Sequence, residues 1–165
     1  MSEKFVFHGS PTEFDAETAK PEMNQRINGA GETIFNEESF HATPHKWIAL
    51  VYTYTATPIE GLGEQTCYSM GVNLYSDKKE VAIFGVGSLE ESLAVLYGNG
   101  GYVYHFDNGT FVYKEGLGDQ EVVSNTPTTP LHMERVDDPV KEMEALGVTF
   151  HFIDLSLDEN ADMRN

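Results

Sequence analysis

The sequence predicts an α+β protein with a mostly antiparallel, split or sandwiched β-sheet and two or three short helices. Three observations support this fold class: many short segments with strand-like alternation, few segments with helical spacing and caps, and many hairpin-length connections. The 165 residues, 40% of them hydrophobic, are enough for one core of ordinary size. We expect a single domain over residues 1–154 and an acidic, flexible tail over residues 155–165.

The first predicted element is a short apolar strand, Lys4-Phe5-Val6-Phe7-His8, which Gly9-Ser10-Pro11 ends at once. The segment from Gly9 to Glu38 is rich in Asn, Gly, Glu and Pro, and we interpret it as a long irregular loop. A short strand and turn follow at residues 39–44. Thr43 is the expected N-cap of a helix that has Pro44 in its first turn and ends before Pro58. Its buried face is expected to carry Trp47, Leu50, Val51 and Tyr54.

Strand patterns dominate the middle of the chain. Residues 66–74 alternate between apolar and polar or small side chains, and residues 80–86 form a more uniformly apolar strand. Ser88-Leu89-Glu90-Glu91 is a capping box that opens a helix ending at Gly98. Asp107-Asn108-Gly109 lies between two further strand patterns, and because Asn-Gly tolerates positive φ we predict a β-hairpin there.

The last third of the chain is predicted to add three strands and one helix. The strands cover residues 121–124, 131–136 and 148–154. The helix begins at Asp138-Pro139 and ends at Gly147.

Charge and cysteine content limit the partners and the compartment. Ten basic and 27 acidic residues give a formal net charge of −17, which repels nucleic-acid phosphates and suits cationic partners. The single cysteine, Cys67, cannot form an intramolecular disulfide, and this favours a reducing compartment. We see neither a secretory leader nor an apolar run of membrane-spanning length. We therefore expect a cytoplasmic protein that contacts neither membranes nor nucleic-acid backbones.

Three separate segments carry candidate site residues. They are the strand-terminal His8, the strand-to-helix segment Phe40-His41-Ala42-Thr43 with Ala49 further along, and Glu121 at the start of a late strand.

The order of these segments resembles the ADP-ribosyltransferase fold, in the branch with a His–Tyr–Glu signature. Phe7-His8-Gly9-Ser10 matches the family pattern of an aromatic residue, His, Gly and Ser or Thr. The resemblance implies that NAD is the substrate, that His8 hydrogen-bonds its adenine-side ribose, that Gly9 and Ser10 also bind the cofactor, and that Glu121 and His8 are the catalytic residues. Cleavage of the bond between nicotinamide and ribose creates an oxocarbenium-like carbon, as glycoside cleavage does. A carboxylate such as Glu121 can stabilise that developing charge, and an aromatic ring can hold the leaving group. Phe40 stands where the family has tyrosine; it keeps a π-face for stacking on nicotinamide but lacks the hydroxyl. The acceptor of ADP-ribose would be an unidentified macromolecule.

Several assignments within this site have alternatives. Glu115 and Asp119 compete with Glu121 for the role of the acid. Thr43 is either a helix cap or a cofactor contact, and Arg26 is either solvated or close to the pyrophosphate of NAD. We expect no metal: His41 and His45 are separated by Pro44 and have no third ligand at a suitable spacing.

A second hypothesis needs no catalysis. The charge of −17 and the missing tyrosine also fit a non-enzymatic acidic binding or inhibitor protein, either a nucleic-acid mimic or a degenerate relative of the transferase fold. A mimic would carry its carboxylates in spaced rows on a convex face, whereas an enzyme would bring its site residues together in a concave pocket.

Overall fold

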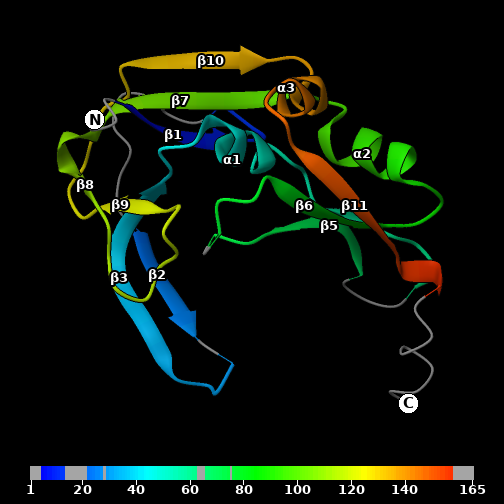
Figure 1. The fold of residues 1–165 in the computed structure, drawn as a ribbon, viewed down its shortest axis with the longest axis horizontal. Coiled ribbons are helices and arrows are strands. Elements are labelled where there is room, and N and C mark those ends of the chain that lie inside the picture. Colours follow the sequence, from blue (N-terminus) through cyan, green and yellow to red (C-terminus); the bar gives the residue numbers. More distant parts are fainter. Residues whose placement is uncertain (1–4, 14–21, 28, 63–65, 75, 158–165) are drawn as a thin grey trace.

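The fold is known from a computed structural model, which describes residues 5–13, 22–27, 29–62, 66–74 and 76–157. Over these residues it confirms the α+β class, with three α-helices and three mostly antiparallel sheets (Figure 1). No helix in the described ranges is long and apolar enough to cross a membrane. Lys4 and residues 158–165 of the expected tail lie outside the described residues.

Three sheets form the framework of the fold (Figure 1). The first has the antiparallel order β1-β7-β10, with β1 (Phe5–Ser10), β7 (Gly101–Asp107) and β10 (His132–Val136). The second has the order β11-β6-β5-β4, with β4 (Thr57–Pro58), β5 (Cys67–Val72), β6 (Glu80–Gly85) and β11 (Thr149–Asp154), where β6 and β11 are parallel. The third has the antiparallel order β2-β3-β9-β8, with β2 (Glu22–Ile27), β3 (Thr33–Ala42), β8 (Phe111–Val112) and β9 (Val122–Ser124).

Helix α1 (Lys46–Val51) lies at the centre of the molecule. All residues from Trp47 to Val51 are buried, so the helix is apolar on every side, as expected of an element enclosed by other layers. Its neighbours in the main core include Val81 and Ile83 of β6 and Met143 of α3 (Pro139–Ala145). Helix α1 is therefore a fixed wall against which a site can be built.

The predicted caps of the two other helices are confirmed. The Ser88 hydroxyl accepts a hydrogen bond from the amide of Glu91 at 3.1 Å and begins α2 (Leu89–Tyr97). The Asp138 carboxylate likewise accepts from the amide of Lys141 at 3.1 Å and begins α3. Each side chain satisfies one of the amides that have no partner inside the helix.

The predicted hairpin at Asp107-Asn108-Gly109 is wrong. β7 pairs with β1 and β10, whereas β8 pairs with β9 in another sheet. The Asp107 carboxylate accepts a hydrogen bond from the amide of Gly109 at 2.8 Å and starts a 3₁₀ turn, η1 (Asn108–Thr110). This turn leads the chain from the first sheet to the third instead of folding it back on itself.

The interpretation of residues 9–38 as one long loop is also wrong in part. β2 and the first half of β3 form an antiparallel ribbon that projects from the body of the molecule (Figure 1). Gly31, in the turn between them, has a φ of 81°, a conformation that glycine adopts without steric cost. Because the ribbon is largely exposed, it lacks the apolar alternation by which a buried strand is recognised.

The N-terminus of α1 differs from the expectation as well. The helix begins at Lys46, with His45 as its N-cap residue and without a side-chain cap. The Thr43 hydroxyl accepts a hydrogen bond from the amide of His45 at 3.1 Å, and the Thr43 amide and carbonyl pair with the backbone of Phe7. Thr43 therefore joins β3 to β1 instead of capping the helix, and Tyr54 lies beyond the helix end at Val51.

The end of the expected single domain is continuous with a short 3₁₀ helix, η2 (Leu155–Leu157). These residues belong to the segment predicted as the start of the tail. They are ordered because the Asp154 carboxylate accepts from both the amide and the hydroxyl of Ser156, at 2.9 and 2.6 Å.

Candidate functional site

A pocket of about 300 Å³ lies where β1, β3 and α1 meet. Five of the residues predicted from the sequence line its wall: His8, Gly9, Arg26, Thr43 and Glu121. Ser10 and Phe40, which were also predicted, are not part of the wall. The structure thus places the predicted residues His8 and Glu121 in one pocket. From the second predicted segment, His41 lines the pocket in place of Phe40.

His8 lies within β1, which stays paired with β7 as far as Ser10, so the predicted strand end at His8 is wrong. Its imidazole is neutral. The Nδ1–H of its ring donates to the backbone carbonyl of His41 at 2.7 Å, because a carbonyl can only accept. Burial lowers the pKa of His8, the carbonyl opposes this shift, and the nearby His41 adds to it. With the proton on Nδ1, the acceptor of this imidazole is Nε2, which suits a ligand hydroxyl.

Phe40 is a correction to the predicted site. Its ring stacks on the imidazole of His8, with centroids 4.5 Å apart, and packs against Phe106 and Phe111 on the other side. Phe40 and Ala42 face the same apolar cluster, because side chains two apart on a strand share a face. Phe40 therefore supports His8 from behind instead of forming a platform for a ligand.

Ser10 is the second correction. Its hydroxyl donates to the carbonyl of Thr12 at 2.7 Å and accepts from the amide of the same residue at 3.2 Å. These bonds turn the chain away after β1, so the hydroxyl serves the turn and not the pocket. Thr43 does line the pocket but is 5% exposed, with its hydroxyl engaged at His45.

Gly9 allows β1 to approach α1. A Cβ atom on this residue would overlap the carbonyl oxygen of Ala49, which also lines the pocket. The close approach brings the strand end against the central helix and fixes the position of His8 relative to the wall formed by α1.

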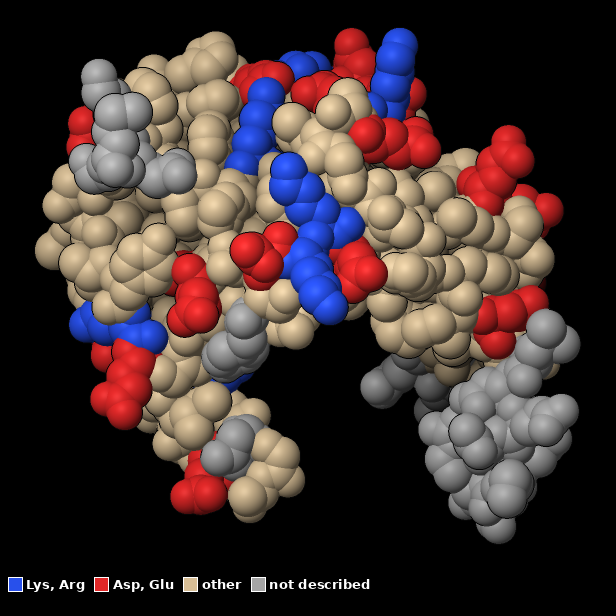
Figure 2. Space-filling model, in the orientation of Figure 1, with Lys and Arg blue, Asp and Glu red and all other residues tan. Residues whose placement is uncertain are grey.

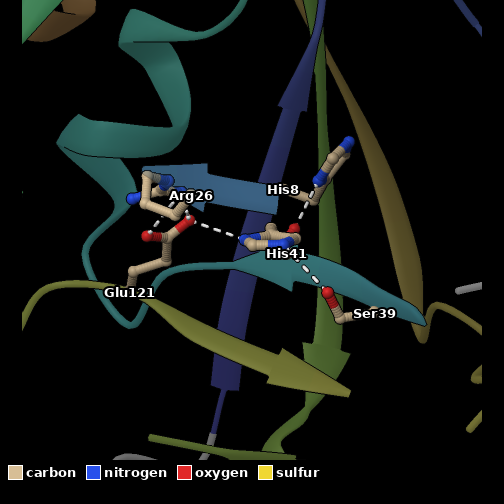
Figure 3. A network of polar contacts seen from close by, with 5 residues as sticks. All are labelled: His8, Arg26, Ser39, His41 and Glu121. Carbon is tan, nitrogen blue, oxygen red and sulfur yellow. Dashed lines mark hydrogen bonds and ion pairs between the residues drawn. The ribbon is translucent and has the colours of Figure 1, made fainter. Parts of the chain in front are cut away.

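Glu121 is the central acid of the pocket (Figure 3). It immediately precedes β9 and is 7% exposed. Its carboxylate accepts from the Nδ1–H of His41 at 2.7 Å and from Nη2 of Arg26 at 3.2 Å to both oxygens. Burial by itself would raise the pKa of Glu121, but the hydrogen bonds and charges of His41 and Arg26 outweigh it and lower the pKa. The group is therefore an ionised, oriented carboxylate.

The competing acids do not share this position. Glu115 and Asp119 are exposed, and neither lines the pocket. Among the three acids considered from the sequence, Glu121 is the one that the fold directs inward.

His41 is the residue that sequence reasoning missed. It lies on the opposite face of β3 from Phe40, with its side chain between Glu121 and Ser39 (Figure 3). A shift of one residue along a strand exchanges the two faces, and the mixed polarity of β3 did not fix which face is inward. The sequence held one signal for this. The apolar Ala42 is two residues from Phe40 and shares its strand face, which leaves His41 on the other face.

Arg26 comes from the segment that was expected to be a loop. It lies on β2, and its side chain is 33% exposed at the edge of the pocket. Within the described residues its ion pair and hydrogen bonds use Nη2 alone. Nε and Nη1 therefore remain for an anionic ligand, in the fork geometry that suits phosphate.

Two aromatic side chains do line the pocket, Phe7 and Tyr52. Tyr52 directly follows α1, and burial together with the charge of Glu121 raises its pKa to about 12. Its phenol is therefore neutral at physiological pH. These rings provide the aromatic surface that the sequence assigned to Phe40.

A second, more open hollow of about 550 Å³ adjoins the pocket. The two share Arg26 and Leu74, so they meet at the end of the pocket where Glu121 lies. The hollow extends over one face of the second sheet, where Gly71, Ala82 and His151 are register neighbours. Small side chains at the centre of this face leave the space open.

In the described part of the chain, no group of three or more His, Cys, Asp or Glu side chains is arranged to hold a metal ion. Cys67 is a free thiol in β5.

No family model, no curated protein and no solved structure matches this chain.

The free energy of unfolding is expected to fall as the pH is lowered below about 6.5. Burial lowers the pKa of His8 from its ordinary 6.5, so below that pH the unfolded chain binds a proton that the folded chain does not. The loss is at most about 1.4 kcal/mol per pH unit for one group. Below pH 4.5 Glu121 adds a second loss, because its folded pKa is lower than its ordinary 4.5.

Urea denaturation at a series of pH values measures this dependence. His8→Gln is expected to flatten the slope just below pH 6.5 and to leave the loss below pH 4.5 in place. Equal slopes in the variant and the parent protein would contradict a buried neutral imidazole at this position.

Proposed function

We propose that the pocket binds NAD and cleaves the bond between its nicotinamide and ribose, transferring ADP-ribose to an acceptor. The observation that carries this proposal is the convergence of a histidine on β1 and an oriented, ionised glutamate, 113 positions apart, on one pocket wall. The motif Phe7-His8-Gly9-Ser10 and its similarity to ADP-ribosyltransferases support the same reading.

The proposed roles follow from the geometry of each group. Nε2 of His8 accepts a ribose hydroxyl, and Glu121 accepts the 2-hydroxyl of the ribose next to nicotinamide. Phe7 or Tyr52 supplies a face for the nicotinamide ring. Nε and Nη1 of Arg26, at the edge of the pocket, donate to the pyrophosphate, while Nη2 donates to Glu121.

The reaction is balanced without a further redox partner. The C1′–N bond breaks and its electron pair leaves with neutral nicotinamide, while the ribose carbon becomes oxocarbenium-like. The Glu121 carboxylate stabilises that positive charge. A nucleophile on the acceptor then bonds to C1′ and releases one proton. We place the acceptor in the second hollow, because it reaches the pocket on the Glu121 side.

The pocket size is consistent with part of a dinucleotide. Its volume of about 300 Å³ is at the lower end of small-molecule sites, which span about 300–1,000 Å³. One nucleoside end would be enclosed and the other would lie across the open rim.

The distribution of surface charge favours the enzyme hypothesis over the nucleic-acid mimic. On the face drawn in Figure 2 the acidic side chains lie in separate groups, with lysine and arginine between several of them. A mimic is expected to present its carboxylates in spaced rows instead.

Isothermal titration calorimetry with NAD tests the proposal. We expect one saturable site in the parent protein and weaker binding in His8→Ala, because the variant loses both the acceptor nitrogen and the ring over Phe40. No heat of binding at millimolar NAD, or an affinity unchanged by His8→Ala, would remove the proposed function.

A further inference from the structure

Three polar side chains lie in line behind the proposed reaction centre (Figure 3). Ser39 and His41 are two residues apart on β3 and therefore share a face. The Ser39 hydroxyl oxygen is 3.0 Å from Nε2 of His41, and Nδ1 of His41 is 2.7 Å from the Glu121 carboxylate.

The acceptor character of the carboxylate fixes the protons. Ionised Glu121 has no hydrogen to donate, so Nδ1 of His41 carries one. The Ser39 hydroxyl, which can both donate and accept, holds the Nε2 end of the same ring at 3.0 Å.

The same connectivity of Ser, His and acid occurs in serine hydrolases, where the hydroxyl is a nucleophile. Here Ser39 is 1% exposed and is not part of the pocket wall. A substrate carbon cannot reach its oxygen. Ser39 and His41 therefore act on Glu121 through their hydrogen bonds, and Ser39 does not attack a substrate carbonyl.

We infer that Ser39 and His41 are positioning residues: Ser39 holds the ring of His41 in place, and His41 in turn orients the Glu121 carboxylate. The buried hydroxyl holds the ring from one end, and the 9% exposed Glu121 side chain receives the bond at the other. The kinetic consequence rests on the proposed function, whereas the hydrogen bond from His41 to Glu121 does not.

¹H–¹⁵N correlation spectra of histidine-labelled protein detect the proton on Nδ1 of His41 and report the strength of its hydrogen bond to Glu121. We expect this proton in the parent protein, with a chemical shift that Ser39→Thr keeps because it retains a hydroxyl. In Ser39→Ala we expect the Nδ1–H resonance to shift upfield, because the ring loses one of its two side-chain partners and its bond to Glu121 weakens. A parent protein without a proton on Nδ1, or an unchanged resonance in Ser39→Ala, would overturn the inference.

Steady-state cleavage of NAD measures the effect on Glu121. We expect Ser39→Ala to lower kcat by about 3- to 10-fold, the effect of one hydrogen bond, with KM for NAD changed less than about twofold. Ser39→Thr should restore kcat, and thermal unfolding confirms that both variants are folded. His41→Asn, which keeps an N–H near the position of Nδ1, should retain more activity than His41→Leu.

Equal kcat in Ser39→Ala and the parent protein, or equal activity in His41→Asn and His41→Leu, would contradict the positioning role. Absence of NAD cleavage in every form would remove the proposed function instead. The spectra of His41 would then decide the positioning role by themselves, so the two failures are distinguishable.

Discussion

Replacing Glu121 by Gln is expected to lower kcat for NAD cleavage by about 10²- to 10³-fold, the usual effect of losing one group that stabilises transition-state charge. The substitution keeps the size of the side chain and an oxygen for His41 and Arg26, but it removes the negative charge. Because that charge acts mainly on the oxocarbenium-like state, KM should change much less than kcat. Release of nicotinamide, measured by chromatography, gives both constants.

Two matched controls separate this effect from a general loss of acidity. Glu115→Gln and Asp119→Asn remove one negative charge each from exposed positions outside the pocket. Both should retain kcat within about twofold, since charges at exposed sites are screened by solvent and salt. If kcat fell as much in either control as in Glu121→Gln, the assignment of Glu121 as the catalytic acid would be wrong.

Gly9→Ala is expected to cause the largest loss of stability, at least about 3 kcal/mol, because the new methyl group overlaps the backbone carbonyl of Ala49. Backbone of the central helix cannot yield as a flexible side chain would, and β1 must move away from α1. For a chain of this size the melting temperature should fall by roughly 6–12 °C.

Gly29→Ala is the matched control. A Cβ atom there meets nothing within 4 Å, so we expect a change within about 0.5 kcal/mol. Thermal unfolding followed by circular dichroism compares the two variants. A Gly9→Ala protein as stable as Gly29→Ala would show that the contact between β1 and α1 is loose.

The elements with local signals were predictable from the sequence. Ser88 and Asp138 mark helix starts because their side chains bond to amides three residues ahead, an interaction complete within four residues. The turn at Asp107 shows the limit of such signals. A local bond fixes the turn there, but pairing partners about 10 to 100 residues away decide which sheet each flanking strand joins.

The site was predictable in part for the same reason. Glu121 lies where a strand begins, and His8 lies in a short apolar strand next to a glycine, so both were visible in the local pattern. The choice between Phe40 and His41 depended on the face of β3, which only tertiary packing against the apolar cluster settles. Arg26 was hidden because its strand pairs with β3 and its apolar side chains Met23 and Ile27 are exposed.

A structure of the protein with bound NAD tests the central claim most directly. We expect the ribose next to nicotinamide within hydrogen-bonding distance of Glu121, and another hydroxyl of the dinucleotide at Nε2 of His8. NAD bound outside this pocket, or a pocket that stays empty at saturating NAD, would contradict the account.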